Sequence, residues 1–128
     1  MNKNTLQKRP VYLNLLKIRQ PVTALASIAH RISGVFLFLS IPCLIWLLDQ
    51  SLTSEASYET VIAQLASPVS KLLLIALAWS AAHHLFAGIR FLFLDVDVGV
   101  ELAAARRSAL IVNVLGALVA LMAMVAVL

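Results

Sequence analysis

Charged residues are scarce in this sequence, and their scarcity excludes most classes of soluble protein. Of the 128 residues only 12% are charged while 62% are hydrophobic, and the mean hydropathy is +0.95. Soluble domains are typically about half apolar and about a quarter charged. A chain of this composition cannot cover a globule with polar side chains, so a soluble enzyme is excluded. Intrinsic disorder is excluded too, because Leu, Ile, Val and Ala are abundant.

Cysteine is almost absent, since Cys43 is the only one in the chain. One thiol cannot form an intrachain disulfide, and a zinc site has no second thiolate on which to build. Cys43 lies in an apolar run and is interpreted as a packing residue. The first 20 residues also lack the short apolar core and small-residue cleavage site of a signal peptide, so we expect no cleavable leader.

Three apolar runs are long enough to cross a membrane, and they cover residues 22–48, 69–94 and 108–128. About 20 residues at about 1.5 Å of rise each cross a hydrocarbon core of about 30 Å. Backbone polar groups in lipid must be satisfied within their own segment, so each run is expected to be a helix. The sequence therefore predicts an all-α integral membrane protein with three transmembrane helices in a single domain, residues 1–128.

Prolines mark the predicted helix starts and one predicted kink. Pro21 and Pro68 each precede an apolar run, which suits the first turn of a helix. Ser67 is a plausible N-cap for the second helix. Pro42 lies inside the first run, where it removes a backbone donor and predicts a kink.

Basic residues predict the orientation of the three spans. The segment 1–21 is basic and the predicted loop 95–107 carries Arg106 and Arg107, whereas the predicted polar loop 49–67 has no Lys or Arg; Lys71 is the exception. The positive-inside rule then places the N-terminus in the cytoplasm and the C-terminus in the periplasm of a bacterial inner membrane. The net charge of +4 is thus explained by topology, and no nucleic-acid partner is expected.

The N-terminal segment 1–21 interleaves apolar and basic residues. This pattern is typical of an interfacial segment on an anionic leaflet. It is equally typical of an arm that docks on a cytoplasmic partner. Both interpretations are kept.

Ionisable residues inside a span are costly and are therefore functional candidates. These residues are His30 and Arg31 in the first run and His83, His84 and Arg90 in the second. Helical rise places Arg31 about 13 Å and His84 about 15 Å below the same surface. Because the two spans are antiparallel, His30, Arg31 and His84 are expected to meet at one depth. Ser27 lies one turn before Arg31 on the same face.

A haem held by an imidazole is the function that this arrangement favours. His84 and Gly88 share a helix face, and the glycine leaves room for a large flat group. Imidazole is a common axial ligand of haem, and arginine binds carboxylates such as propionates in bidentate fashion. The alternative is that each histidine is a buried, hydrogen-bonded side chain with no ligand.

Other polar residues of the spans have structural interpretations. His83 points about 100° away from His84 and is predicted to be structural. Arg90 is predicted to extend to the headgroups or to pair with Asp95 or Asp97. The third run has Asn113 as its one strongly polar interior residue and is predicted to pack through small residues.

Two spaced motifs resemble a known family. The first is Arg9-Pro10, then Ser27, His30-Arg31 and Ser33; the second is His84 followed by Gly88, Ile89, Arg90 and Phe91, with Asp95 shortly after. The sequence resembles the cytochrome b membrane-anchor subunit (the C subunit) of bacterial succinate dehydrogenase, respiratory complex II. The similarity extends over essentially the whole chain, although Phe91 replaces a histidine found in several relatives.

The resemblance implies a role in electron transfer from succinate to ubiquinone, without a succinate-oxidising site in this chain. It implies a single membrane-anchor domain that assembles with a flavoprotein subunit, an iron–sulfur subunit and a second anchor subunit. His84 matches the axial ligand of haem b, and the second anchor supplies the other axial histidine. His30 and Arg31 match residues near the haem propionates, and Ser27 and Arg31 match residues of the quinone site.

Three alternatives stay open on the residues alone. Ligation of one haem by both His30 and His84 is possible on depth, although the family pattern argues against it. A haem-free or fumarate reductase-type anchor would use the same spans without the cofactor. A small transporter subunit is the third, but polar residues do not follow a continuous path through the spans.

Overall fold

The computed structural model describes residues 18–128, which form four helices and no strand. The helices are α1 (Val22–Thr53), α2 (Glu55–Leu65), α3 (Pro68–Asp95) and α4 (Leu102–Val127). α1, α3 and α4 are long and apolar enough to cross a membrane. The predicted all-α class with three such helices is therefore confirmed, while most of the predicted N-terminal segment, with its Arg9-Pro10 pair, lies outside the described residues.

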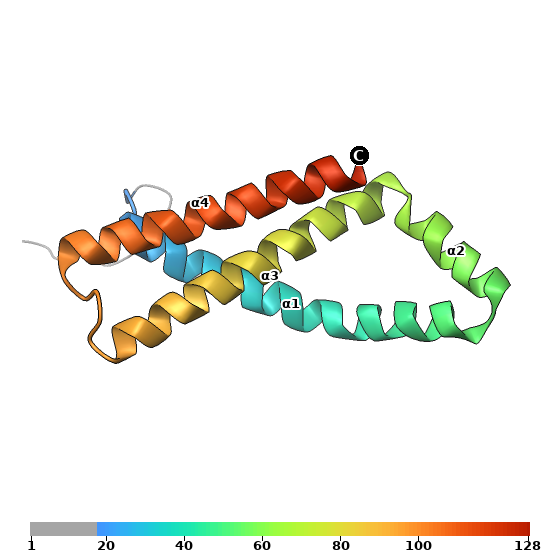
Figure 1. Cartoon of the computed structure of the whole chain (residues 1–128), viewed down its shortest axis with the longest axis horizontal. Helices are drawn as coiled ribbons and strands as arrows, with labels where there is room; N and C mark the ends of the chain where they lie inside the picture. Colours follow the sequence, from blue (N-terminus) through green and yellow to red (C-terminus); the bar gives the residue numbers. More distant parts are fainter. Residues whose placement is uncertain (1–17) are drawn as a thin grey trace, which may run out of the picture.

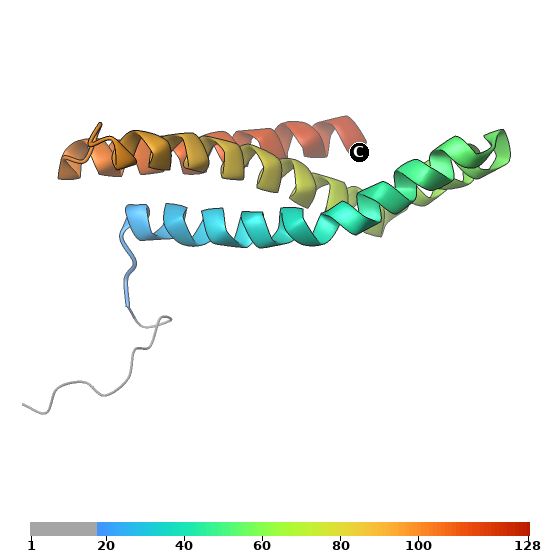
Figure 2. The ribbon, with the colours of Figure 1, turned by 90° about the horizontal axis from the view of Figure 1, so that it is seen from below.

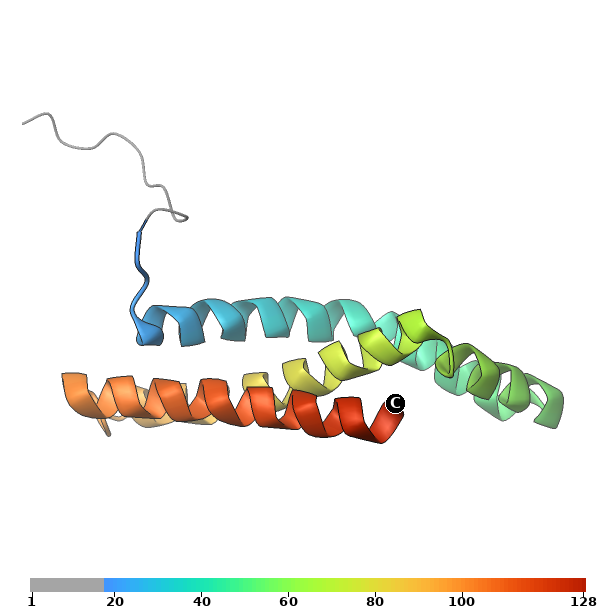
Figure 3. The ribbon, with the colours of Figure 1, turned by 90° about the horizontal axis from the view of Figure 1, so that it is seen from above.

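α3 packs against both of the other long helices (Figure 1). Figure 3 shows α3 and α4 together in one layer and α1 in a second layer, and α1 contacts both of them. Several of the buried positions between helices are occupied by small residues, namely Ala26, Ala87, Ala109 and Gly116. Small residues let membrane helices approach closely. Most large apolar side chains point outward, as expected where lipid or a partner helix surrounds the bundle.

α1 continues through Pro42 without a break in the helix. Figure 2 shows that α1 changes direction where its colour passes from cyan to green, the region of this proline. Proline lacks the N–H for its helical bond and its ring crowds the preceding turn, which bends a helix. The predicted kink is thus present.

The prediction that residues 49–67 form a loop is wrong, because α1 runs to Thr53 and α2 fills most of the rest. Ser54 caps α2 through a capping box, in which its hydroxyl accepts from the Ser57 N–H at 3.2 Å. The Ser57 hydroxyl donates to the Gln50 carbonyl at 2.7 Å and ties α2 to the end of α1. Serines that indicate a loop by composition here cap a helix.

The turns at the two ends of α3 differ. Ser67 caps the helix by accepting from the Ser70 N–H at 3.3 Å, with Pro68 in the first turn, as predicted. The loop after α3 is shorter than predicted because α4 already begins at Leu102. Asp97 and Gly99 in this loop have φ of 59° and 77°, and they reverse the chain direction tightly.

Candidate functional site

His84 of α3 and His30 of α1 meet face to face. Their ring centroids are 4.1 Å apart and the ring planes differ by 10°. Both side chains are half-buried. The predicted meeting of the two residues at one depth of the bundle is therefore observed in the structure.

The second contact of His84 fixes which of its ring nitrogens carries hydrogen. Nδ1 lies 3.1 Å from the backbone carbonyl oxygen of His30. A carbonyl only accepts, so Nδ1 is the nitrogen that carries hydrogen in this bond, and in the neutral imidazole the lone pair is then on Nε2. The Ser33 hydroxyl donates to the same carbonyl at 2.8 Å, and its oxygen lies 3.4 Å from Nδ1. His84 thus presents the tautomer that binds a metal through Nε2.

Gly34 lets the His84 ring lie directly against the backbone of α1. A Cβ at this position would lie 2.8 Å from Cε1 and 3.2 Å from Nδ1 of His84. Real Cβ atoms essentially never approach as closely as the first distance, so only glycine fits. The sequence reasoning did not find this contact, although a Ser33-Gly34 pair one turn after His30 was a readable signal.

His30 itself is enclosed by aromatic and backbone groups of α3. Its ring centroid lies 5.2 Å from that of Phe91, at an interplanar angle of 57°. A Cβ on Gly88 would lie 3.7 Å from His30 Nε2, which is ordinary contact. The space predicted beside Gly88 therefore borders the His30 ring.

The stacked rings bear on ligation within one chain. His30 and His84 turn their ring faces toward each other, whereas two axial ligands turn their nitrogens toward the metal between them. No group of three or more potential metal ligands occurs among residues 18–128. Stacked in this way, the two imidazoles do not both direct a nitrogen at one metal between them.

Ser27 and Arg31 lie one turn apart on α1, and His30 lies between them in the sequence. Ser27 is half-buried and Arg31 is exposed. Within the described part of the chain, no hydrogen bond joins either side chain to His84. The exposed Arg31 is therefore accessible to a ligand or to a partner subunit.

His83 turns toward α4, away from His84, as predicted. It is 1% exposed, and its Nε2 lies 3.0 Å from Oδ1 of Asn113. A Cβ on Gly116 would lie 3.2 Å from the Cβ of His83, so the two helices are in close contact here. The pair of His83 and Asn113 joins α3 to α4 by a buried polar contact.

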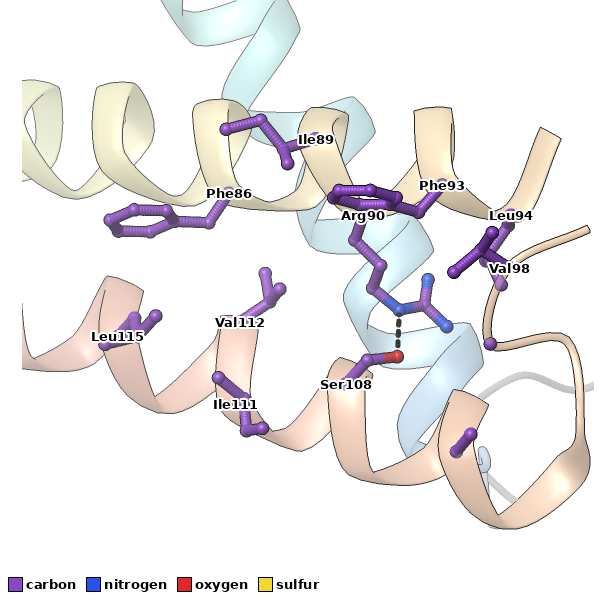
Figure 4. Close-up of a pocket in the computed structure, with 12 residues that line it drawn as sticks. Phe86, Ile89, Arg90, Phe93, Leu94, Val98, Ser108, Ile111, Val112 and Leu115 are labelled. Carbon is purple, nitrogen blue, oxygen red and sulfur yellow. Dashed lines mark hydrogen bonds between the residues drawn. The ribbon is translucent and has the colours of Figure 1, made fainter. Parts of the chain in front are cut away.

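The prediction for Arg90 is wrong, because it neither extends to the headgroups nor pairs with Asp95 or Asp97. It is 7% exposed and points toward α4 (Figure 4). Nε donates to the Ser108 hydroxyl at 3.0 Å and Nη2 to the Ala105 carbonyl at 3.1 Å. Arg90 lies two turns after His83 and one turn after Ala87, and both of these residues are buried. All three are on the face of α3 that packs on α4, so the Arg90 side chain points inward.

Comparison with known proteins now identifies the class to which this bundle belongs. Residues 5–124 match the family described as succinate dehydrogenase/fumarate reductase transmembrane subunit. The chain belongs to this family and is a multi-pass membrane protein.

The more specific resemblance is also confirmed. The chain is 39% identical over 103 residues to the succinate dehydrogenase cytochrome b556 subunit of Coxiella burnetii, covering 80% of this chain and 82% of the relative. It is 36% identical over 98 residues to the subunit of the same name from Rickettsia prowazekii, covering 76% and 75% of the two chains. The subunit from Paracoccus denitrificans is 32% identical over 100 residues, covering 78% and 77%.

Proposed function

We propose that this chain is the haem b-binding membrane-anchor subunit of a succinate dehydrogenase and takes part in electron transfer from succinate to ubiquinone. The observation that carries the proposal is the hydrogen bond from His84 Nδ1 to the His30 carbonyl, at 3.1 Å. It selects the tautomer whose free Nε2 suits an axial ligand. The names of the similar subunits, which all contain cytochrome b556, support the same cofactor.

The residues present fit haem b. His84 would be the axial ligand from this chain, and the second axial histidine would come from the second anchor subunit, since the stacking turns the face of His30 toward His84. His30 and Arg31 would hold the propionates, for which the guanidinium offers a bidentate fork. When bound, haem b supplies a site that accepts and releases one electron at a time.

Ser27 and Arg31 are proposed to form this chain's part of the quinone site. The Ser27 hydroxyl can donate to a quinone carbonyl, and Arg31 is permanently charged and stabilises negative charge that develops on reduction. Arg31 is exposed and on the outer side of α1. The site would therefore be completed by a neighbouring subunit.

The proposed assembly contains a flavoprotein subunit, an iron–sulfur subunit and the second anchor. We propose that the N-terminus and the α3–α4 loop are cytoplasmic and that α2 and the C-terminus are periplasmic, in a bacterial inner membrane. The basic Arg106 and Arg107 at the start of α4 support this orientation. Residues 1–128 then act as one membrane-anchor domain.

An absorption spectrum of the purified complex tests the cofactor directly. We expect one haem b per copy of this chain by pyridine haemochrome assay, with low-spin α and β bands on reduction. A complex that oxidises succinate and contains no haem would contradict the proposal and would favour the haem-free or fumarate reductase-type anchor.

Gly34→Ala is expected to displace the His84 ring from α1 and so to alter the haem spectrum. The added Cβ would lie 2.8 Å from Cε1 of His84, opposite the rigid backbone of α1. We expect a shift of the low-spin EPR g-values and a haem affinity lowered about tenfold or more, the effect expected when groups that orient a ligand are disturbed. Gly116→Ala is the matched control, because its Cβ would also crowd a neighbouring helix, at 3.2 Å from His83 Cβ, but does not contact His84. Identical spectra for the two variants would show that Gly34 does not position the ligand.

A further inference from the structure

Arg90 carries a buried positive charge that no carboxylate of this chain neutralises. The sequence contains six acidic residues, and all of them lie in the described range. None forms an ion pair with Arg90, whose two hydrogen bonds go to a hydroxyl and a neutral carbonyl. The Phe91 ring, whose centroid is 5.2 Å from the guanidinium carbon, is the other polarisable group in contact. An uncompensated guanidinium at membrane depth is costly, so a counter-charge from outside the chain is expected.

A groove between α3 and α4 contains this charge and is otherwise apolar. Its volume is about 430 Å³. Apart from Arg90 and Ser108, its walls are apolar side chains and backbone (Figure 4). Inward from Arg90 the walls include Phe86 and Ile89 of α3 and Ile111, Val112 and Leu115 of α4, and toward the loop they include Leu94, Val98 and Ala104. The charge therefore lies partway along the groove, and the part that runs inward from it is apolar.

Arg90 and Ser108 lie near the ends of their helices, on the side of the bundle that carries the α3–α4 loop. Arg90 precedes the end of α3 by five residues and Ser108 follows the start of α4 by six, which is about 8 Å and about 9 Å of helix. The exposed Arg106 and Arg107 lie at the same end. From Arg90 the groove runs toward Leu115, deeper into the apolar part of both helices.

We propose that this groove binds an anionic phospholipid, with the phosphate at Arg90 and one acyl chain along α3 and α4. A phosphate supplies the missing negative charge, and the apolar walls match an acyl chain that follows the helices toward the bilayer centre. A free phosphate would leave the apolar walls in contact with water. A zwitterionic lipid would bring no net charge to Arg90. The proposal does not depend on haem or quinone binding.

Native mass spectrometry of the assembled complex tests the proposal. The complex is stripped of lipid in detergent and exposed to an equimolar mixture of synthetic phosphatidylglycerol and phosphatidylcholine. We expect the wild type to retain phosphatidylglycerol about fivefold more often, the preference that one basic residue gives at an anionic membrane surface. Arg90→Gln should abolish this preference, and Arg107→Gln, which removes an exposed charge from the same end, should preserve it.

Ile111→Trp provides a second variant that leaves Arg90 unchanged. Ile111 is exposed and lines the groove between Ser108 and Leu115, so a large side chain there should block the acyl chain and lower retention without removing the bonds of Arg90. If the complex with Arg90→Gln does not assemble, the comparison of lipid retention between Ile111→Trp and the wild type still tests the proposal.

Four results would overturn the proposal. One is a wild type without preference for phosphatidylglycerol, and another is an undiminished preference in Ile111→Trp. The third is full competition by excess glycerol phosphate, which would show that a phosphate without acyl chains is the ligand. Loss of a partner subunit from Arg90→Gln with lipid retention unchanged would likewise overturn it, because a partner carboxylate would then neutralise Arg90.

Discussion

Replacing His84 with leucine is expected to abolish the low-spin haem b spectrum of the assembled complex. Of the two ring nitrogens of His84, Nε2 is the one proposed to bind iron, because Nδ1 lies 3.1 Å from the His30 carbonyl oxygen. Leucine has similar bulk and no lone pair, so packing at the junction of α1 and α3 is largely retained while ligation is lost. The measurement is the reduced-minus-oxidised absorption spectrum together with EPR of the oxidised complex.

His83→Leu is the matched control for this prediction. His83 is the adjacent histidine on α3, but it is buried against Asn113 of α4 at 3.0 Å. Its replacement leaves Asn113 without a partner and should lower thermal stability, yet the haem spectrum should persist. A normal spectrum in His84→Leu, indicating an iron with two histidine ligands, would refute the assignment of His84.

Arg31→Ala is expected to lower succinate–ubiquinone reductase activity by about a hundredfold, the loss typical of removing one group that stabilises charge in the transition state. The guanidinium is exposed on α1, one turn from the Ser27 hydroxyl. Succinate oxidation with an artificial dye does not use the quinone site, so that activity should remain nearly unchanged in the same preparation. The ratio of the two activities is therefore the informative measurement.

Arg107→Ala serves as the control for charge. Arg107 is an exposed arginine at the start of α4, and its removal should leave the ratio of the two activities as in the wild type. An unchanged ratio in Arg31→Ala as well would remove Arg31 from the quinone site. A lowered ratio with a lost haem spectrum would assign Arg31 to the propionates alone.

The sequence was sufficient to predict the three long helices and the level of the bundle at which His30 and His84 meet. Apolar runs of membrane length have one viable backbone structure, and Ser67 and Pro68 marked where α3 begins. Fixed helical rise then placed His30 and His84 at one depth, and the structure brings their rings within 4.1 Å.

The rotation of each helix about its own axis could not be predicted with the same certainty. A membrane helix is apolar on every side, so hydropathy does not indicate which face packs against a neighbour. For this reason the partners of Arg90, which are Ser108 and the Ala105 carbonyl, were missed in favour of nearby aspartates. The contact of Gly34 with His84 depends on the same rotation, since it joins residues 50 positions apart in sequence.

α2 was missed for a different reason. Its polar composition is typical of a loop, and its single buried residue, Val61, gives no clear periodic pattern. What stabilises the helix is the reciprocal capping of Ser54 and Ser57. Such a box normally has Glu or Gln in the third helical position, and Ser57 occupies it here.

The chemical nature of the group that accepts the hydrogen bond from His84 determines whether this contact depends on pH. Histidine ligands commonly donate to a carboxylate, a carbonyl or water. Here the acceptor is the peptide oxygen of His30, which Ser33 also holds by a hydrogen bond. A peptide oxygen neither gains nor loses a proton between acidic and alkaline growth conditions, unlike a carboxylate. The acceptor of this hydrogen bond therefore stays the same when the proton concentration of the surroundings changes.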